Sequence, residues 1–404
     1  MMRIFQIATE EEIKKGETTD VYFVRTTEIL QKEGLTEQRV VAEVTTGSLP
    51  RDWDWAVFAG VEEAVHLMEG ISVDVESLAE GSIFRPKDHR GTRLPVMTLD
   101  GRYLDFSLYE TPLLGLLCQA SGMATMAARV RKGAGKDSTI LSFGIRRAHP
   151  VLAPMIDRAC YLGGFDAVSS IIGARLLDLQ PTGTMPHSLI VSIGDQVKAW
   201  KSFNKYMPKD VPRIALVDTY YDEKTESIMA AEALGKDLYG VRLDTPGSRR
   251  GDFAEIIREV RWELDARGFD KVKIFVSGGL DEHSVGRYAR AGADGFGVGS
   301  AVSSAPAVDF AMDIVEIEGR PVAKRGKLSW KKQVWRCKEC LSTRVTRRSV
   351  NDHPDCPEGH GKMVLLSKKF LEKGRLVGPH LPKPIEIRES VLGQLELVEL
   401  LPKL

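Results

Sequence analysis

Short apolar segments alternate with helical patterns along the chain from about residue 138 onward. Most of these segments have Ile, Val and Leu in succession, which is typical of strands that are buried on both faces of a parallel sheet. The alternation predicts repeated βαβ units. The predicted strands are residues 138–143, 167–170, 188–192, 213–218, 239–244, 273–279 and 295–300.

Two stretches predict helices of different kinds. Over residues 252–267, apolar residues recur at helical spacing on one face, and Gly268 follows where the helix would end. Residues 111–128 carry no charge, but they are too polar and too short to span a bilayer comfortably. We therefore expect a helix buried inside a soluble domain there.

Element length, turn residues and local charge divide the chain into three parts. Residues 1–110 have short elements and frequent turn residues, which predicts a separate α/β domain. The helix pattern over 389–401 is expected to pack back on this domain, so that segment 366–404 joins it. Residues 111–323 form the predicted α/β barrel domain, and the basic stretch 324–365 forms a small metal-binding module.

The composition favours a multidomain cytoplasmic protein. At roughly 150 residues per domain, 404 residues give two or three domains. The 56 basic and 56 acidic residues cancel, so no overall field attracts nucleic acid or an anionic membrane, and we expect neither as a partner. The N-terminus is charged and lacks the apolar run of an export signal. Five cysteines are too few for a disulfide framework and suggest a reducing compartment.

Polar residues or glycines stand where the predicted strands end. Asp218, Asp244, Gly279 and Ser300 each close a strand. In a (β/α) barrel these are active-site positions. A doubly wound open sheet is the alternative fold, and it would also bind ligands at the carboxyl ends of its strands.

The last two strand ends are rich in glycine, around 277–279 and 297–300. Glycines allow backbone N–H groups to approach phosphate oxygens, and barrels often bind phosphate in the loops after their last two strands. Tight βα turns are the alternative reading of a single such loop. Because two consecutive strands share the pattern, it favours a phosphate site.

Two arginine pairs, Arg146 with Arg147 and Arg249 with Arg250, also follow strand ends. Guanidinium groups bind phosphate and pyrophosphate through paired hydrogen bonds. A solvated surface is the ordinary explanation of one arginine pair. Two pairs near the same barrel face predict a substrate that carries several phosphates.

Three further residues have two readings each. Asp218 and Asp244 could hold ribose hydroxyls or a Mg²⁺ ion bound to a polyphosphate, or they could cap the following helices. His187 lies in a loop bent by Gly and Pro just before a predicted strand. A structural role and a catalytic role are both open for this histidine.

The C-terminal region contains a pattern typical of a zinc site. Cys337 and Cys340 are followed after fifteen residues by Cys356 and His360. Two ligand pairs, each from a tight turn, can build a closed tetrahedral site, which would be structural and not catalytic. His353 is the alternative fourth ligand. The surrounding basic residues could touch nucleic acid, but a solvated face of a small metal-stapled module explains them as well.

Several motifs together resemble the nicotinate phosphoribosyltransferase family, in particular archaeal-type members with a C-terminal zinc module. Each motif alone is weak, but their order and spacing are specific and cover nearly the whole chain. The motifs are residues 19–23, 121–125, 143–147, 183–187, 218–220, 242–245, 277–279 and 297–299.

This resemblance implies a fold and an activity. Members of the family have an N-terminal α/β domain and an irregular α/β barrel, usually in a homodimer or higher homo-oligomer whose active sites are shared between subunits. They transfer phosphoribose from phosphoribosyl pyrophosphate (PRPP), bound with Mg²⁺, to nicotinate, which gives nicotinate mononucleotide and pyrophosphate in NAD salvage. In ATP-coupled relatives the histidine that matches His187 becomes phosphorylated, so ATP is a further candidate cosubstrate.

The resemblance also implies roles for individual residues. Tyr22 from a neighbouring subunit and Phe143 would sandwich the pyridine ring, and Arg146 would face the phosphates or the ring carboxylate. Asp218 and Asp244 would hold the ribose or Mg²⁺. The other residues implied to bind substrate are Arg147, Arg242, Ser277, Gly278, Gly279, Gly299 and Ser300.

Three other functions compete with this one. Asp166 falls near the place where nicotinamide-specific relatives keep an aspartate, and an ionised carboxylate beside the ring would repel nicotinate, which favours a nicotinamide phosphoribosyltransferase. A quinolinate phosphoribosyltransferase shares the fold but needs a more basic pocket for two carboxylates. A zinc-ribbon nucleic-acid-binding protein is the alternative from a different class.

Overall fold

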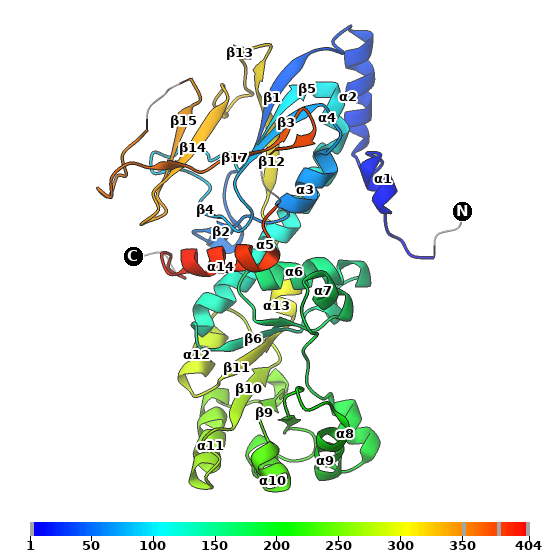
Figure 1. The fold of residues 1–404 in the computed structure, drawn as a ribbon, viewed down its shortest axis with the longest axis vertical. Coiled ribbons are helices and arrows are strands. Elements are labelled where there is room, and N and C mark those ends of the chain that lie inside the picture. Colours follow the sequence, from blue (N-terminus) through cyan, green and yellow to red (C-terminus); the bar gives the residue numbers. More distant parts are fainter. Residues whose placement is uncertain (1–3, 350–352, 378–380, 401–404) are drawn as a thin grey trace. The chain divides into compact units, whose positions relative to one another are not determined.

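The computed structural model shows a chain that forms two compact units (Figure 1). The residues it describes are 4–349, 353–377 and 381–400. The first unit consists of residues 1–125 and 306–404, and the second unit of residues 126–305.

The first unit is built on an antiparallel sheet of seven strands. In spatial order they are β13 (Arg320–Pro321), β12 (Phe310–Ile317), β1 (Arg39–Thr46), β5 (Met97–Arg102), β3 (Val73–Ser77), β17 (Lys368–Glu372) and β18 (Arg375–Leu376). Strand β1 lies near the centre of the sheet and is buried along all but its first residue. Strands β12 and β13 belong to this sheet, although the sequence placed their residues in the barrel domain 111–323.

Smaller elements complete the first unit. Its helices are α1 (Glu10–Lys14), α2 (Val21–Lys32), α3 (Val61–Met68), α4 (Tyr103–Phe106) and α14 (Pro384–Leu395). Two more sheets consist of β2 (Ala56–Val57) with β4 (Ile83–Phe84), and of β15 (Thr343–Arg347), β14 (Lys332–Arg336) and β16 (Val364–Leu365).

Helix α14 overlaps the helix predicted over 389–401, but it begins earlier, at Pro384, and ends earlier, at Leu395. Proline suits the first turn of a helix, where its missing N–H has no partner to lose. The buried Gln394 donates to the carbonyl of Gly81 and accepts from the N–H of Ile83, so the helix packs on N-terminal residues as expected. Leu401, the last residue of the predicted helix, lies outside the described residues.

Helix α5 (Glu110–Ala134) confirms the buried helix predicted over 111–128. It is long and apolar enough to be a candidate membrane span, but 72% of its most apolar window is buried inside the protein, as in the core helix of a soluble protein. Near its end, α5 needs a glycine because the backbone of another segment lies too close for a side chain. A Cβ at Gly133 would lie 2.1 Å from the carbonyl oxygen of Glu282.

The second unit is built on six parallel strands. In spatial order they are β7 (Ala167–Val168), β6 (Thr139–Ser142), β11 (Gly295–Val298), β10 (Lys273–Ser277), β9 (Gly240–Leu243) and β8 (Ile214–Leu216). Its helices are α6 (Ala153–Leu162), α7 (Ile171–Leu176), α8 (His187–Ile193), α9 (Gln196–Tyr206), α10 (Glu223–Leu234), α11 (Phe253–Ala266), α12 (Ser284–Arg290) and α13 (Ser300–Ser303).

Six of the seven predicted strands are confirmed, and the strand predicted at 188–192 is wrong. Those residues form helix α8, which begins after Pro186 and ends at Gly194 with a left-handed φ of 81°. A short apolar run does not distinguish a strand from a helix by itself, and here the helix stop at Gly194 decides.

The missing strand explains why the barrel is irregular. The hydrogen-bonded ladder runs from β7 through β6 and β11 round to β8, and in the described residues no ladder joins β8 to β7. Helices α7, α8 and α9 connect these two strands along the chain. The predicted fold class, an irregular α/β barrel with an N-terminal α/β domain, is confirmed.

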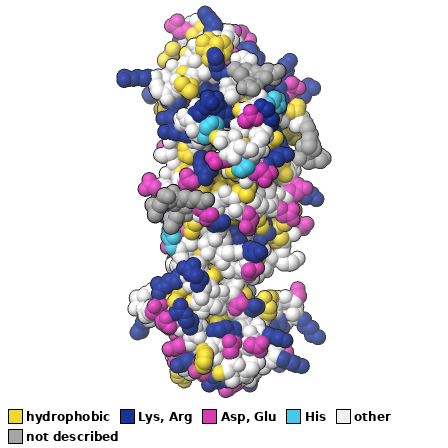
Figure 2. All heavy atoms as spheres, turned by 90° about the vertical axis from the view of Figure 1, so that its left-hand side faces the viewer, with side chains coloured by type: hydrophobic (Ala, Val, Ile, Leu, Met, Phe, Trp, Pro, Cys, Tyr) yellow, Lys and Arg dark blue, Asp and Glu magenta, His cyan; other side chains and the backbone are white. Residues whose placement is uncertain are grey.

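Charged side chains of both signs are interspersed on the surface, as the face in Figure 2 shows. Several form exposed ion pairs one helical turn apart, such as Lys15 with Glu11 and Lys32 with Glu28. Exposed pairs of this kind contribute little to stability because water screens them. This face therefore agrees with a net charge of +0.

The close approach at Gly133 gives a test of the packing of α5. We expect Gly133→Ala to lower the free energy of unfolding by about 1–3 kcal/mol, because the added methyl group meets a backbone oxygen that cannot swing away. Gly115, an exposed residue of the same helix with no atom within 4 Å of its would-be Cβ, is the matched control. Gly115→Ala should raise stability by up to about 1 kcal/mol through helix propensity. Urea denaturation followed by circular dichroism measures both, and an unchanged midpoint for Gly133→Ala would contradict the packing.

Candidate active site

A cavity of about 600 Å³ opens at the carboxyl ends of the parallel strands of the second unit. Most of the residues that the sequence predicted to bind substrate line it. The lining residues are Phe143, Ile145, Arg146, Arg147, Ser169, Pro186, His187, Ser188, Arg242, Asp244, Ser277, Gly278, Gly279, Gly297, Gly299 and Ser300.

Phe143 provides the aromatic wall of the cavity. It follows the last residue of β6, and its backbone N–H donates to the carbonyl of Val298 at the end of β11. A Cβ at Gly297 would lie 2.3 Å from the Phe143 ring, so the ring lies directly on the glycine backbone. The lack of a side chain at Gly297 thus gives the ring its place beside the cavity.

A buried arginine joins three segments beneath the cavity. Arg242, on β9, is 8% exposed and donates to Ser277 Oγ at the end of β10 over 3.0 Å. It also donates to the carbonyl of Met185 over 3.0 Å and forms a 3.2 Å ion pair with Asp244. Ser277 Oγ in turn donates to Asp244 over 2.7 Å. This network holds two strand ends and the loop that leads to His187 in one arrangement.

Two carboxylates face His187, which begins helix α8. The Nε2 atom of His187 lies 3.8 Å from Asp218 Oδ1 and 3.7 Å from Asp244 Oδ2. The Nδ1 atom lies 3.2 Å from Thr219 Oγ1. Asp218 Oδ2 accepts the backbone N–H of Asp244 over 3.1 Å. The predicted catalytic residues His187, Asp218 and Asp244 therefore form one cluster.

Asp218 is the most perturbed acid of this cluster. Its side chain is only 4% exposed, and its Oδ1 atom has no hydrogen-bond partner among the described residues. Burial is the main cause that raises the pKa of Asp218 from 3.8 to about 6, and the nearby charge of His187 opposes it. A buried acid whose pKa is raised in a cleft is typical of functional sites.

Only one of the two predicted arginine pairs lines the cavity. Arg146 and Arg147 are exposed and line the cavity, as expected of groups that bind phosphate or carboxylate. Arg250 is instead bound to the protein, since it donates to the carbonyls of Thr245, Ser277 and Gly278. Arg250 therefore stabilises the glycine loop through these hydrogen bonds. Arg249 is not among the residues that line the cavity.

Asp166 is not at the site, which corrects the sequence-based expectation. Its carboxylate pairs with Arg131 at 2.5 Å and accepts the N–H of Ile140 over 2.8 Å, at the amino ends of β6 and β7.

Ser169 lies at the other end of β7 and lines the cavity. The sequence did not single out Ser169, although its place directly after a strand was the signal that identified Asp218.

Asp157, in helix α6, is a second residue beside the cavity that the sequence did not single out. It is fully buried and accepts hydrogen bonds from Ser142 Oγ over 2.8 Å and from both the hydroxyl and the N–H of Ser170. These serines flank Phe143 and Ser169 in the chain. Asp157 therefore holds the ends of β6 and β7 together next to the cavity.

Tyr22, the predicted partner of Phe143 in the aromatic sandwich, belongs to the first unit. It lies in the first turn of α2 and is 55% exposed. Burial is the main cause that raises the pKa of the Tyr22 hydroxyl, followed by the nearby carboxylates of Asp20 and Glu110. Its role in binding stays a prediction.

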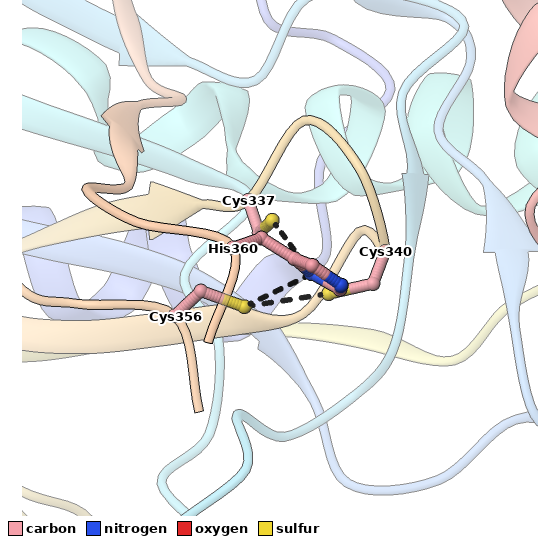
Figure 3. A group of neighbouring side chains, drawn as sticks. All are labelled: Cys337, Cys340, Cys356 and His360. Atoms are coloured by element: carbon pink, nitrogen blue, oxygen red, sulfur yellow. Dashed lines mark hydrogen bonds between the residues drawn. The ribbon is translucent and has the colours of Figure 1, made fainter. Parts of the chain in front are cut away.

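The four predicted metal ligands converge in the first unit. The side chains of Cys337, Cys340, Cys356 and His360 point toward one another (Figure 3), and their ligand atoms all lie within 4.8 Å of one another. The Nδ1 atom of His360 is 3.7 Å from Cys337 Sγ and 3.6 Å from Cys356 Sγ, and Cys340 Sγ is 3.5 Å from Cys356 Sγ. A tetrahedron with metal–sulfur bonds of about 2.3 Å has edges of about 3.8 Å. The donor set therefore fits a tetrahedral metal ion.

The backbone near two of the cysteines favours thiolate ligands, although burial raises the pKa of Cys337. The backbone N–H groups of Glu339 and Glu358 each point at the cysteine two residues earlier. Although burial raises it, the pKa of Cys356 is lowered to about 7 by backbone N–H groups, chiefly that of Glu358. His353, the alternative ligand, packs its ring on Trp335 with 4.7 Å between the ring centres. The structure therefore selects His360.

The raised pKa of Asp218 predicts a dependence of stability on pH. Because the folded state binds this proton more tightly than the unfolded state, the associated stability is present below about pH 4 and lost as the pH rises through about 6. Asp218→Asn removes this loss. We expect the free energy of unfolding of the variant, relative to the unaltered protein, to increase by roughly 2–3 kcal/mol between about pH 4 and pH 8. Urea unfolding at a series of pH values measures it.

Asp222, a few residues further on, is the control with the opposite sign. Burial raises its pKa, but hydrogen bonds from Thr225 outweigh this and the pKa of Asp222 is lowered. Asp222→Asn should therefore lose stability relative to the unaltered protein as the pH rises. Parallel pH profiles for the two variants would contradict the assignment of the burial effect to Asp218.

The chain matches two models of known protein families. The N-terminal domain of quinolinate phosphoribosyl transferase matches residues 20–121, and the C-terminal domain of the same family matches residues 123–313. Both parts of that two-domain frame are thus present in this chain.

Solved structures show the same fold. Nicotinate-nucleotide pyrophosphorylase from Pyrococcus furiosus is 53% identical, with a TM-score of 0.93, and the match covers 98% of this chain and 99% of that one. Human nicotinic acid phosphoribosyltransferase is 22% identical with a TM-score of 0.77, covering 95% of this chain and 94% of the human one, which is evidence for the fold alone.

The curated relatives are nicotinate phosphoribosyltransferases. The nicotinate phosphoribosyltransferase of Bacillus subtilis is 30% identical over 340 residues, 74% of this chain and 66% of the relative. A nicotinate phosphoribosyltransferase of Mycobacterium tuberculosis is 33% identical over 277 residues, 65% of this chain and 57% of the relative. The chain thus spans less than two thirds of the length of these relatives. Together, the two matching domains, the Pyrococcus furiosus neighbour at 53% identity and the Bacillus subtilis relative at 30% identity show that the chain belongs to the family of nicotinate and quinolinate phosphoribosyltransferases.

Proposed function

We propose that this protein transfers the phosphoribosyl group of PRPP to nicotinate and releases nicotinate mononucleotide and pyrophosphate. The observation that carries the proposal is the single cavity that combines an aromatic wall, exposed arginines and glycine loops at the ends of the barrel strands. The aromatic wall suits a pyridine ring, and the arginines and glycines suit phosphates.

The reaction needs few chemical groups from the protein. The ring nitrogen attacks C1 of the ribose while pyrophosphate leaves, so the enzyme mainly has to orient the ring and stabilise the departing charge. Phe143 would orient the ring, and Arg146 and Arg147 would neutralise phosphate or carboxylate. A Cβ at Gly279 would face open space, so the backbone of this loop is accessible to a phosphate.

The lining of the cavity favours nicotinate over the two alternative bases. Asp166, the main support for nicotinamide, is bound to Arg131 away from the cavity, and Ser169 stands there without a charge. Quinolinate has two carboxylates, whereas Arg242 is already paired with Asp244. Arg146 and Arg147 are then left for one ring carboxylate and the phosphates.

The assembly and the cosubstrates belong to the same proposal. A second copy of the chain would bring Tyr22 to the cavity, and exposed apolar residues of α2 next to it, Val21 and Val24, support a contact surface there. Asp218 and Asp244 would hold the Mg²⁺ that accompanies PRPP. His187, which lines the cavity, is the residue through which ATP would act.

We further propose that the cysteine and histidine cluster holds a structural zinc ion. The four donors are of the types that zinc prefers, and they close the tetrahedron, which leaves no position for a substrate. The net charge of +0 and the strand-end aspartates Asp218 and Asp244 argue against a nucleic-acid-binding protein, which gains its affinity from basic groups.

The metal cluster gives a prediction about composition. Purified protein should contain about one zinc ion per chain, and Cys356→Ser should lose it because one of four ligands is gone. Elemental analysis by mass spectrometry measures the ion. His353→Ala is the matched control, since His353 packs on Trp335, and it should keep the zinc. Loss of zinc in the His353 variant with retention in His360→Ala would reverse the ligand assignment.

The experiment that tests the function compares three bases. Mononucleotide formation from PRPP and Mg²⁺ is measured with nicotinate, nicotinamide and quinolinate in parallel, each with and without ATP. We expect turnover with nicotinate. Preference for nicotinamide or quinolinate would overturn the choice of base, and no turnover with any base would overturn the proposal.

Phe143→Ala tests the aromatic wall within the same assay. We expect the KM for nicotinate to rise roughly tenfold, equivalent to about 1.4 kcal/mol, because the ring loses its stacking surface. The KM for PRPP should change much less and serves as the internal control. Equal losses for the two substrates would place Phe143 elsewhere than beside the base.

A further inference from the structure

A fully buried carboxylate, Glu226 in the first turn of helix α10, organises the loop that follows β8. It is 0% exposed and accepts three backbone N–H groups in succession. These come from Thr219 over 3.1 Å, Tyr220 over 2.8 Å and Tyr221 over 3.0 Å. The side chains of Tyr220 and Tyr221 are 47% and 60% exposed, so their packing contributes little. The path of this loop therefore depends on Glu226.

The same loop delivers the hydroxyl that touches His187. Thr219 Oγ1 lies 3.2 Å from His187 Nδ1, while its backbone N–H is held by Glu226. The His187 side chain is 42% exposed, so packing alone does not fix the orientation of the ring. A hydrogen bond to one ring nitrogen is thus the main constraint on how the imidazole lies.

The charges around the ring decide which nitrogen carries the proton. Nε2 faces the carboxylates of Asp218 and Asp244, and Asp244 is also paired with the cation Arg242. Two carboxylates favour a proton on Nε2. The lone pair of the neutral ring is then on Nδ1, where it accepts the hydroxyl proton of Thr219.

We propose that Glu226 and Thr219 are positioning residues for His187. Glu226 fixes the loop, and the Thr219 hydroxyl fixes the ring as the Nε2–H tautomer, with Nε2 directed at Asp218 and Asp244. The proposal deepens the proposed function, because it rests on that function for the importance of His187 at the cavity. The tautomer and orientation of the ring are nevertheless properties that can be measured without any turnover.

A merely structural role of these residues makes a different prediction. If Glu226 only stabilised the fold, its replacement would lower the free energy of unfolding but leave the ring of His187 as it is. If Thr219 only filled space, valine, which has nearly the same shape, would replace it without effect. The two roles are therefore separated by observing the ring itself.

The experiment is nuclear magnetic resonance of the full-length protein labelled with ¹⁵N only in histidine. Long-range ¹H–¹⁵N correlations report the tautomer of each ring, and His187→Gln assigns the signal. We expect His187 to show Nε2–H and an unprotonated Nδ1 at a pH where the ring is neutral. Thr219→Val should produce a mixture of tautomers, and Thr219→Ser should restore the original pattern because serine keeps the hydroxyl.

Glu226→Gln tests the loop, with Thr225→Val as the matched control. Glutamine keeps the size of the side chain, but its NH₂ group cannot accept a backbone N–H, so the His187 signal should shift as in Thr219→Val. Thr225 lies on the same helix, and its hydroxyl donates to Asp222 and not to Glu226 or His187, so its replacement should leave the signal unchanged. An unchanged tautomer in both Thr219→Val and Glu226→Gln would overturn the proposal.

Kinetics then connect the ring to the reaction. Thr219→Val should lower kcat about tenfold to a hundredfold, as expected when a group at the reacting centre is misplaced, with little change in the KM for nicotinate. Thr219→Ser should recover most of this loss. If the ring responds as expected but the unaltered protein transfers no phosphoribose, the positioning roles stand and the proposed function fails. If the ring responds and kcat in Thr219→Val equals that of the unaltered protein, the link of the positioning residues to catalysis is overturned.

Discussion

The buried guanidinium of Arg242 is the interaction on which the candidate active site depends. It joins the end of β10 through Ser277, the carbonyl of Met185 before helix α8, and the carboxylate of Asp244. A buried charge is stable only when it is paired and hydrogen bonded, so each of these partners is held in place by the others. The same low-polarity surroundings raise the pKa of Asp218 to about 6. Stability and function are thus coupled in one network.

In the first unit, the cysteine and histidine cluster would stabilise a small module by binding a metal ion. The three-stranded sheet of β14, β15 and β16 has a small apolar core, in which Trp335 and Met363 pack with Cys337 and Cys356. So little buried surface does not stabilise a module of this size by itself, and small modules commonly add a metal ion or disulfides. A tetrahedral ion bound by four side chains would supply the missing constraint. Its role would then be structural.

Much of the fold and of the site followed from the sequence because local patterns carried the information. Buried parallel strands are short apolar runs, and six of them were recognisable as such. The residues at their carboxyl ends must meet at one edge of the sheet whatever the detailed packing. For that reason Asp218, Asp244, Gly279 and Ser300 could be assigned to one site before any contact was known. The spacing of Cys337, Cys340, Cys356 and His360 likewise fixed a metal cluster.

What the sequence by itself determined were therefore the repeating units, the strand ends and the ligand pairs, each of which depends on neighbours in the chain. Only the tertiary structure decided that residues 188–192 are helical, that Asp166 pairs with Arg131, and that β12 joins the N-terminal sheet. It also revealed the buried acids Asp157 and Glu226. These outcomes depend on partners far away in the sequence. The local sequence of a carboxylate, a short apolar run or an edge strand does not reveal which distant partner it will contact.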